Sequence, residues 1–205
     1  WALSSFYQKA LDKIYEATNN PVETQAETLR KILYYNAESV FGHQHSFGKI
    51  NNYEDFKKAV PIRDFEGFRI YTDAILSGQK KVLTVENPFR MATTSGSTGE
   101  PKTIPITHRF KEQISDISRL WLKVAFAEHP RLFEGNFLSV VSPAVESEGQ
   151  AGLPFGSMSG LTYKHQKAAM RAKYALPYKV MTIKNYEIKY LCALIISIRK
   201  NITFL

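Results

Sequence analysis

The sequence has almost no cysteine, since Cys192 is the only one among 205 residues. A single thiol excludes an internal disulfide and any metal knuckle built from paired cysteines, and it is typical of a protein from a reducing compartment. Long apolar runs are scarce too. The run around Cys192, LCALIISI, is far shorter than the roughly 20 residues that span a bilayer. We therefore expect a cytoplasmic protein without a membrane anchor, in which Cys192 is an inert residue of an apolar helix.

Acidic residues are missing from one part of the chain. The whole sequence has 27 Lys and Arg against 19 Asp and Glu, a net charge of +8. Residues 1–148 carry 18 of each sign, whereas residues 149–205 carry nine basic side chains and the single acid Glu187. Either this segment binds anions, or the acidic surface that complements it lies outside these residues. The chain opens on Trp1 and closes on the apolar NITFL, and a buried strand needs neighbours on both sides, so we interpret it as the N-terminal piece of a longer protein.

The spacing of apolar residues predicts an α/β fold. Helical periodicity covers most of the first 40 residues, broken at Asn19-Asn20-Pro21, and FGHQHSFGKINN reads as a loop. Further helices are expected at 64–76, after Thr107, near 163–175 and at 187–199, and strands at 80–85, 103–107, 136–142, 178–183 and the C-terminal end. Residues 143–160 read as a Gly/Pro loop. The alternation indicates a helical region of about 1–76 followed by an α/β region of about 80–205.

One short loop concentrates chemically useful residues. It reads Thr93-Thr94-Ser95-Gly96-Ser97-Thr98-Gly99-Glu100-Pro101-Lys102, with five hydroxyl side chains and two glycines before the lysine. Glycines let backbone N–H groups converge on an anion, hydroxyls donate hydrogen bonds and lysine adds a positive charge. These properties suit the β- and γ-phosphates of a nucleotide. A solvated surface turn has a similar composition and is the alternative.

Several better-known catalytic loops do not fit. In the Walker pattern the second glycine precedes the lysine directly, but here Gly99 is followed by Glu100-Pro101. The dinucleotide pattern GxGxxG is absent from the sequence. The segment Gly156-Ser157-Met158-Ser159-Gly160 has methionine at the centre, where the GxSxG elbow of serine hydrolases needs serine.

The loop does match the signature of the acyl-adenylating (ANL) superfamily, [ST]-S-G-[ST]-[ST]-G-x-P-K, at every position of Thr94–Lys102. Two flanking segments narrow the resemblance. YEDFKKAVPIRDFEGFRIY at 53–71 and GNFLSVVSPAVESEGQAGLPFGSMSG at 135–160 resemble the Gretchen Hagen (auxin-responsive) family of acyl acid amido synthetases. The likeness runs over most of residues 36–205 and implies part of the layered α/β large domain of an adenylate-forming enzyme, truncated before its end.

The resemblance implies a two-step ligase that uses ATP and Mg²⁺, with a small carboxylic acid and an amino acid as its other substrates. The acid would become an acyl-adenylate with release of pyrophosphate, and the amino acid would then form the amide and release AMP. On this basis the phosphate-binding residues would be Thr94, Ser95, Gly96, Ser97, Thr98, Gly99 and Lys102, with a solvated surface lysine as the alternative role for Lys102. In this family the helix after the loop lines the acyl pocket, which here means Arg119, Leu120, Trp121 and Lys123. Core packing is the alternative role for Trp121, and the Gly152-Leu153-Pro154 loop is a second candidate wall.

The family's catalytic residues, adenine and ribose contacts and C-terminal lid are expected beyond Leu205. We therefore expect these 205 residues alone to be inactive. Two other functions stay open: an adenylate-forming ligase that transfers the acyl group to coenzyme A, and a non-catalytic nucleotide-binding remnant.

Weaker patterns point elsewhere. On a strand, His43 and His45 would share one face and could bind a metal ion, but no third ligand is near, so a loop or cap role is favoured. The basic side chains Lys164, Lys167 and Arg171 would share a helical face, with Lys173 nearby. Without a nucleic-acid motif we expect a solvated face, or contact with the absent part of the protein, rather than a nucleic-acid site. Glu146 and Glu148 are candidates for orienting Mg²⁺, with solvated carboxylates as the alternative.

Overall fold

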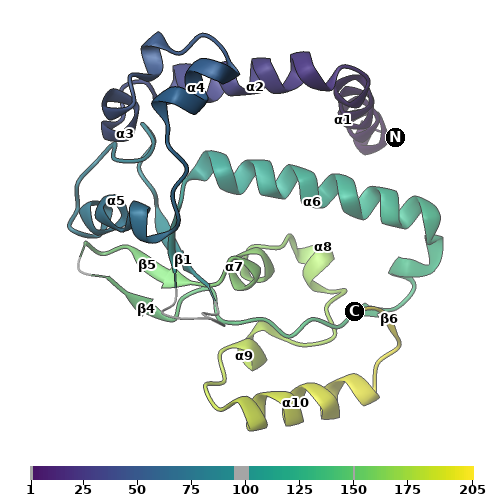
Figure 1. The fold of residues 1–205 in the computed structure, drawn as a ribbon. Helices are drawn as coiled ribbons and strands as arrows, with labels where there is room; N and C mark the ends of the chain where they lie inside the picture. Colours follow the sequence, from purple (N-terminus) through teal and green to yellow (C-terminus); the bar gives the residue numbers. More distant parts are fainter. Residues whose placement is uncertain (1, 95–101, 150) are drawn as a thin grey trace. The chain divides into compact units, whose positions relative to one another are not determined.

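The structure is a computed structural model that describes residues 2–94, 102–149 and 151–205 (Figure 1). The chain divides into two compact units. The first contains residues 1–89 and 107–111, and the second contains residues 90–106 and 112–205. The expected mixture of helices and sheet is confirmed.

The regular elements described in the first unit are all helices. Its elements are α1 (Ala2–Asn19), α2 (Pro21–Asn36), α3 (Val40–Gln44), the 3₁₀ turn η1 (Phe47–Lys49), α4 (Tyr53–Ala59) and α5 (Glu66–Leu76). The break predicted at Asn19-Asn20-Pro21 separates α1 from α2, with Pro21 at the first helical position. Side chains cap α3 and α4, because Ser39 and Asn52 accept hydrogen bonds from the backbone N–H groups of Gly42 and Asp55.

The core of this unit is an aromatic cluster around Phe41. The Phe41 ring meets Phe47 and Tyr71 edge-on, with ring centroids 5.8 Å and 5.2 Å away. The Tyr71 hydroxyl donates to Gln44 Oε1 at 2.6 Å and accepts from Arg63 at 3.2 Å. The cluster therefore ties α3 and η1 to α5 and gives the buried tyrosine hydroxyl two partners.

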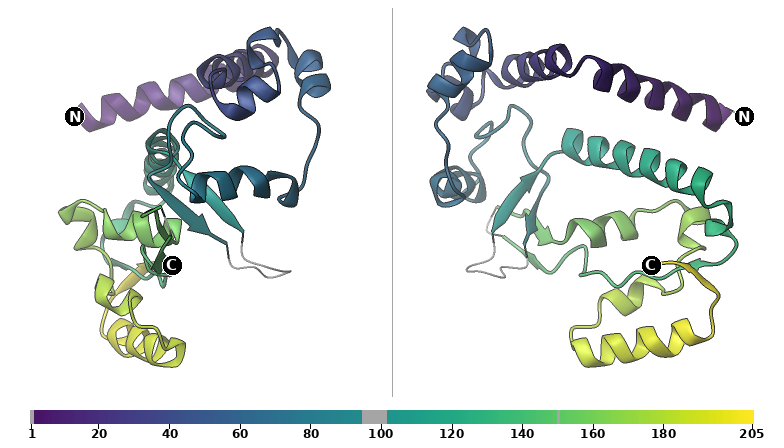
Figure 2. Two further views of the ribbon diagram at one scale, coloured as in Figure 1. Left: turned by 90° about the vertical axis from the view of Figure 1, so that its left-hand side faces the viewer. Right: turned by 45° about the vertical axis from the view of Figure 1, so that its right-hand side comes forward.

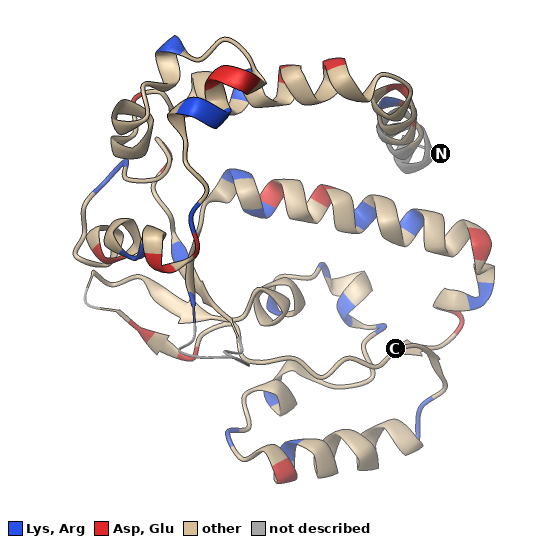
Figure 3. Cartoon of the chain, in the orientation of Figure 1, with Lys and Arg blue, Asp and Glu red and all other residues tan. Residues whose placement is uncertain are grey.

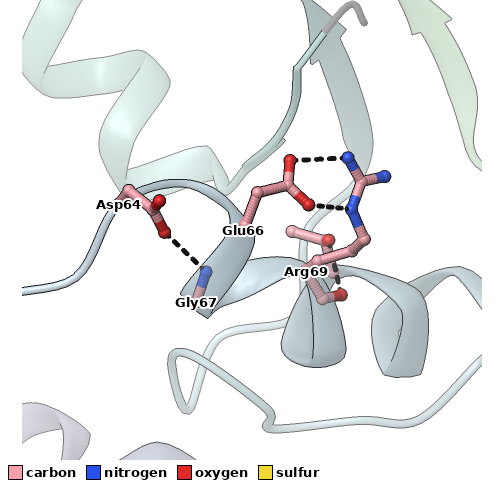
Figure 4. A network of polar contacts seen from close by, with 5 residues as sticks. Asp64, Glu66, Gly67 and Arg69 are labelled. Carbon is pink, nitrogen blue, oxygen red and sulfur yellow. Dashed lines mark hydrogen bonds and ion pairs between the residues drawn. The ribbon is translucent and has the colours of Figure 1, made fainter.

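The start of α5 is held by local polar contacts, which Figure 4 shows from close by. The Asp64 carboxylate accepts from the backbone N–H of Gly67 at 3.0 Å, which satisfies one of the free donors at the helix end. Glu66 and Arg69 form a two-point ion pair, with N–O distances of 2.6 Å and 2.7 Å. The pair is exposed, so it contributes little to the stability of the fold. It links two side chains of the first turn of α5.

Two predictions for this unit are wrong. The FGHQHSFGKINN segment is largely helical, because the Ser39 side chain caps a new helix there. Residues 80–85 do not form a strand. Lys81 has a φ of 52°, which is incompatible with an extended chain. The carbonyls of Lys81 and Val82 accept from the first N–H groups of α3, at 2.8 Å and 2.9 Å, rather than from a neighbouring strand.

The second unit contains the sheet. Four of its described strands pair in the order β2-β1-β5-β4, where β1 is Arg90–Thr93, β2 is Thr103–Ile106, β4 is Ser147–Glu148 and β5 is Pro154–Gly156. Strand β1 is antiparallel to β2 and parallel to β5, so it lies inside the sheet. The short strands β3 (Asn136–Phe137) and β6 (Ile202–Phe204) pair in parallel as a second, separate sheet. Figure 2 shows β1 and β2 side by side.

Helices complete the second unit: most of α6 (His108–Glu128), the turn η2 (Pro130–Phe133), α7 (Met158–Lys164), α8 (Ala168–Arg171), α9 (Tyr178–Met181) and α10 (Tyr186–Ile198). A buried cluster of Leu176, Val180, Met181 and Ala193 joins α9 to α10, and Cys192 packs against it as a partly buried thiol. The helices predicted after Thr107 and at 187–199, and the final strand, are confirmed.

Other predictions for this unit are wrong. Only Asn136–Phe137 of the expected strand at 136–142 is paired as a strand, and the N–H of Val141 donates instead to Met181 Sδ at 3.2 Å. Residues 178–181 form helix α9 rather than a strand, because Val180 and Met181 turn inward from one helical turn that starts after Pro177. The supposed loop at 143–160 contains β4, β5 and the start of α7.

Candidate phosphate-loop site

The predicted phosphate loop connects the two strands of a hairpin. Strands β1 and β2 pair in register from Arg90↔Ile106 to Thr93↔Thr103. Beyond them, the backbone N–H of Thr94 donates to the Lys102 carbonyl at 3.0 Å, and the N–H of Lys102 donates to Thr94 Oγ1 at 3.1 Å. The two ends of the loop are therefore joined by the β1–β2 strand pair, by one backbone hydrogen bond and by one hydrogen bond to a side chain.

Of the predicted phosphate-binding residues, the structure places Thr94 and Lys102, which it brings into direct contact. Thr94 Oγ1 accepts the hydrogen bond from Lys102, and a threonine hydroxyl can also donate one. Lys102 is exposed. The predicted residues Ser95, Gly96, Ser97, Thr98 and Gly99 lie outside the described residues.

Arg90, at the start of β1, is a site-supporting residue that sequence reasoning missed. It is only 2% exposed, and its guanidinium donates to the carbonyl of Ala144. Its Nε has no hydrogen-bond partner among the described residues. Burial lowers the pKa of Arg90, and the nearby Tyr178 hydroxyl opposes part of that shift. A single charged residue close before a phosphate loop was the signal available in the sequence.

The segment around Ala144 lies against the sheet and is fixed from several sides. Its N–H donates to the Tyr178 hydroxyl at 2.8 Å, and the preceding Ser142 carbonyl accepts from Ser157 Oγ at 2.8 Å. Ser157 also caps α7 by accepting from the N–H of Gly160 at 2.9 Å. Strand β5 pairs with β1 through Met91↔Phe155 and Ala92↔Gly156. These hydrogen bonds therefore connect the segment around Ala144, through β5, to the strand that leads into the loop.

The glycines of Gly156-Ser157-Met158-Ser159-Gly160 permit that close approach. A Cβ at Gly156 would collide with the carbonyl of Ala144, and one at Gly160 would collide with the carbonyl of Ser142, in both cases nearer than 3.0 Å. These contacts are with backbone atoms, which cannot move aside as a flexible side chain would. The glycines of this motif therefore allow the 142–145 segment to pack closely against β5 and α7.

The four residues proposed for the acyl pocket lie on α6 but do not form one wall. Arg119 and Lys123 are four residues apart and share a face, whereas Trp121 lies about 160° around the helix from Arg119. Arg119 forms an exposed ion pair with Asp116 at 2.8 Å. Trp121 is 55% exposed and contacts the Phe204 ring, with centroids 5.8 Å apart. Leu120 is half-buried. An acyl wall on α6 therefore involves either the Arg119 face or the Trp121 face.

The Gly152-Leu153-Pro154 segment is the end of a hairpin rather than a free loop. Strand β4 pairs with β5 through Ser147↔Phe155 and Glu148↔Pro154. Gly152 has a φ of +72°, a conformation that glycine adopts without strain. The proposed magnesium residues Glu146 and Glu148 are exposed on this hairpin. The part of the chain that the structure describes holds no group of three or more side chains suited to a metal ion.

The other polar candidates have local partners. His43 lies on α3 and His45 is its C-cap residue, so the strand face that metal binding would require, the alternative to the favoured loop or cap role, does not form. His45 Nδ1 is 2.7 Å from the Ala59 carbonyl, and His43 pairs with Glu38 at 3.3 Å.

The basic stretch is broken, contrary to the prediction of one helix. Helix α7 ends at Lys164 and α8 begins at Ala168, with Lys167 extended between them. Lys164, Lys167 and Arg171 therefore do not share a helical face. Lys173 Nζ is used internally, where it donates to the carbonyl of Phe133.

Comparison with known proteins decides the family. The model of the GH3 family N-terminal domain matches residues 10–205, nearly the whole chain. The chain belongs to the GH3 family. Relatives include the indole-3-acetic acid-amido synthetase GH3.15 of Arabidopsis thaliana, 31% identical over 154 residues, and the jasmonoyl–L-amino acid synthetase JAR6 of Nicotiana attenuata, 24% identical over 172 residues. These matches cover 74% and 80% of this chain but only 26% and 29% of the relatives.

Solved structures agree with this family. A GH3.15 acyl acid amido synthetase aligns with a TM-score of 0.74 at 25% identity, over 92% of this chain and 33% of that one. The same enzyme in complex with 2,4-DB aligns with a TM-score of 0.73. The chain thus spans about a third of the GH3 proteins that it matches, and the predicted resemblance to this family's N-terminal portion is confirmed. Among the helices that the structure describes, none has the length and apolar character of a membrane span.

Proposed function

We propose that this GH3 chain provides the phosphate-binding part of an ATP-dependent acyl acid amido synthetase. The complete enzyme adenylates a carboxylic acid and transfers the acyl group to an amino acid. A carboxylate oxygen attacks the α-phosphorus of ATP, and pyrophosphate leaves. The amine then attacks the acyl carbon of the adenylate, an amide bond forms, and AMP leaves with the oxygen that joined it to the acyl group.

One observation carries the proposal: the full signature Thr94–Lys102 sits on the β1–β2 hairpin of a GH3 chain, and its ends are bonded to each other. Fixed ends reduce the number of conformations available to the segment between them, and positioning supplies much of the rate in phosphoryl chemistry. Hydroxyls, glycine N–H groups and Lys102 are the donor types that β- and γ-phosphate oxygens accept.

Magnesium would be held mainly by the nucleotide. Mg²⁺ usually keeps several waters and binds through one or two carboxylates together with substrate phosphates. The exposed Glu146 and Glu148 fit a supporting role of this kind better than they fit an all-protein metal site. The acid and the amino acid would contact α6 and residues outside this chain, and we expect the 205 residues alone to bind nucleotide weakly and to catalyse neither step.

The loop assignment is tested by nucleotide binding. Calorimetric titration of the 205-residue chain with Mg·ATP should give binding that the double variant Ser97→Ala, Thr98→Ala abolishes. The matched control is Thr18→Ala with Ser77→Ala, which removes two hydroxyls that bond only to nearby carbonyls. Equal binding by the loop variant and the parent would refute the assignment. ATP–pyrophosphate exchange or amide formation by the 205 residues alone would refute the expected inactivity.

Transfer to coenzyme A is the other outcome to be measured. The relatives named above are amido synthetases, which supports an amine as the acceptor. A longer GH3 protein carrying these residues, supplied with an acid, Mg·ATP and either an amino acid or coenzyme A, should form the amide and not the thioester.

A further inference from the structure

Arg90 is a buried cation that the fold around it does not neutralise. Its side chain is 2% exposed. An arginine side chain has five N–H donors, yet the bond to the Ala144 carbonyl is the one that the guanidinium makes among the residues that the structure describes. No carboxylate in that part of the chain lies within ion-pair distance of it. Arginine is almost never fully buried without an ionic partner, so this position needs a reason.

The elements linked to Arg90 and Ala144 carry no acidic residue. Strands β1 and β5 and helices α7 and α9 contain no Asp or Glu, and Figure 3 shows these elements without red segments. The acid that the described sheet does contain, Glu148 on β4, is exposed. A buried charge without a partner costs free energy, whereas an apolar side chain of similar size is often neutral or stabilising. The stability of the sheet therefore does not explain an arginine here.

The bond to Ala144 carries the charge of Arg90 toward the loop end of β1. The Ala144 carbonyl lies beside Gly156, which pairs with Ala92 two residues further along the strand. From Ala92 to an anion bound at Thr94, the strand rise and one hydrogen bond amount to roughly 10 Å. At roughly 10 Å, and with an effective dielectric constant of about 20, a unit charge changes the binding constant of a singly charged group by roughly tenfold.

The guanidinium is also held in one place. The Tyr178 hydroxyl accepts from the N–H of Ala144 at 2.8 Å, so the peptide group that Arg90 binds is fixed from its other end. A buried charge is screened little by salt, and a charge whose position is fixed needs no reorganisation when an anion arrives. Arg90 therefore supplies a preorganised positive field behind the strand that leads into Thr94.

We propose that Arg90 is a positioning residue of the phosphate site, whose fixed and un-neutralised charge draws the β- and γ-phosphates of the nucleotide to the loop end of β1. It does not touch the nucleotide. Its role is the attraction of a polyphosphate anion and not the stability of the sheet. The inference rests on the proposed function and adds to it a residue outside the loop signature.

The first test separates charge from stability. Arg90→Met keeps a long side chain and removes the charge. The control Arg63→Met makes the same change in the first unit, at an arginine whose guanidinium contacts Tyr71 and His45 at 3.2 Å and 3.1 Å. We expect Arg90→Met to weaken Mg·ATP binding by roughly tenfold in calorimetric titration, and to unfold at a urea concentration equal to or above that of the parent. Arg63→Met should leave the affinity unchanged and unfold at lower urea, because it removes bonds to buried partners.

A lysine at the same position tests the charge directly. Arginine stays charged when buried, whereas a buried lysine loses its proton at a lower pH than an exposed one. The Arg90→Lys chain should therefore bind Mg·ATP more tightly than Arg90→Met at about pH 6 and approach the affinity of Arg90→Met by about pH 9. Each titration is compared with the parent at the same pH, so that all groups common to the chains cancel.

Three results overturn the proposal: Mg·ATP binding by Arg90→Met equal to that of the parent, a urea midpoint of Arg90→Met lowered as far as that of Arg63→Met, or an Arg90→Lys chain that binds no better than Arg90→Met at about pH 6. If Ser97→Ala, Thr98→Ala abolishes binding while Arg90→Met keeps it, this inference fails and the proposed function stands. If the loop variant and Arg90→Met both bind as the parent does, the proposed function fails as well.

Discussion

The close approach at Gly160 gives a sharp test of how the sheet is supported. An ideal Cβ at this position would lie 2.6 Å from the N atom of Ala144 and 2.7 Å from the carbonyl carbon of Pro143, and closer still to the Ser142 oxygen. The 142–145 segment cannot retreat, because Ser157, Tyr178 and Arg90 bond it from other sides. Gly160→Ala must therefore strain the backbone or displace α7.

The magnitude follows from two opposing effects. Overpacking in a rigid core costs roughly 1–3 kcal/mol and occasionally more, and three backbone atoms inside 3.0 Å place Gly160 at or above the top of that range. Gly160 lies in α7, where alanine is favoured over glycine by about 1 kcal/mol. We expect Gly160→Ala to lower the free energy of unfolding by about 2–3 kcal/mol, the difference of the two effects.

Urea unfolding measures this change. With Trp1→Phe, the fluorescence of Trp121 reports the second unit alone, which contains Gly160, and far-UV circular dichroism reports both units. The matched control is Gly48→Ala in the first unit, where nothing lies within 4 Å of the added methyl group. We expect this control to be neutral or up to about 1 kcal/mol more stable, and to leave the Trp121 transition unchanged. A Gly160→Ala protein within about 0.5 kcal/mol of the parent would refute the close approach.

Three further outcomes are expected. Burial raises the pKa of Tyr163 from 10.0 to about 12. As pH rises, the unfolded chain therefore loses this proton before the folded chain does. The free energy of unfolding should fall by up to about 2.7 kcal/mol between pH 10 and 12. In urea titrations Tyr163→Phe should reduce this pH dependence, whereas the control Tyr34→Phe should not. Ser39→Ala should cost about 1–2 kcal/mol, because it leaves the N–H of Gly42 without its cap; an unchanged urea midpoint would contradict that role. Asn185→Ala should cost about 1 kcal/mol at the start of α10, and a second-unit midpoint equal to the parent's would count against it.

Long, strongly periodic segments could be predicted from the sequence. The helices α1, α2, α6 and α10 repeat apolar residues over several turns. Pro21 marks the boundary between α1 and α2, because proline is favoured at the first position of a helix and disfavoured inside one. Of the hairpin around the phosphate loop, only the second strand was predicted, because TIPIT is β-rich and follows a glycine-rich turn. The first strand, Arg90–Thr93, was missed, since the strand before the loop was expected at 80–85. Periodicity is reliable where an element is long enough to show it.

Short apolar runs failed because their structure depends on distant partners. VLTV at 82–85 and YKVM at 178–181 were both predicted to lie in strands, yet the first is an irregular segment at the start of α3 and the second is a helical turn. In each case a contact from elsewhere in the sequence decides: Asn36 Oδ1 accepts from the N–H of Val85, and Met181 turns inward to the Val141 N–H. Tertiary contacts override local propensity in such runs.

The candidate site shows the same division between motif and support. The signature Thr94–Lys102 could be recognised because its chemistry is local, but what fixes its leading strand lies some 50 residues further on. Arg90 reaches Ala144 across a sequence separation of 54 residues, and Gly156 of β5, which pairs with β1, has no side chain to collide with the Ala144 carbonyl. A phosphate loop binds well only if its donors are held in place before the ligand arrives. Substitutions at 142–160 should therefore weaken nucleotide binding even though none of these residues belongs to the loop, and calorimetry on Gly156→Ala with Mg·ATP, compared with Gly48→Ala, measures that dependence directly. Unchanged affinity in a folded Gly156→Ala protein would mean that the hairpin alone orders the loop.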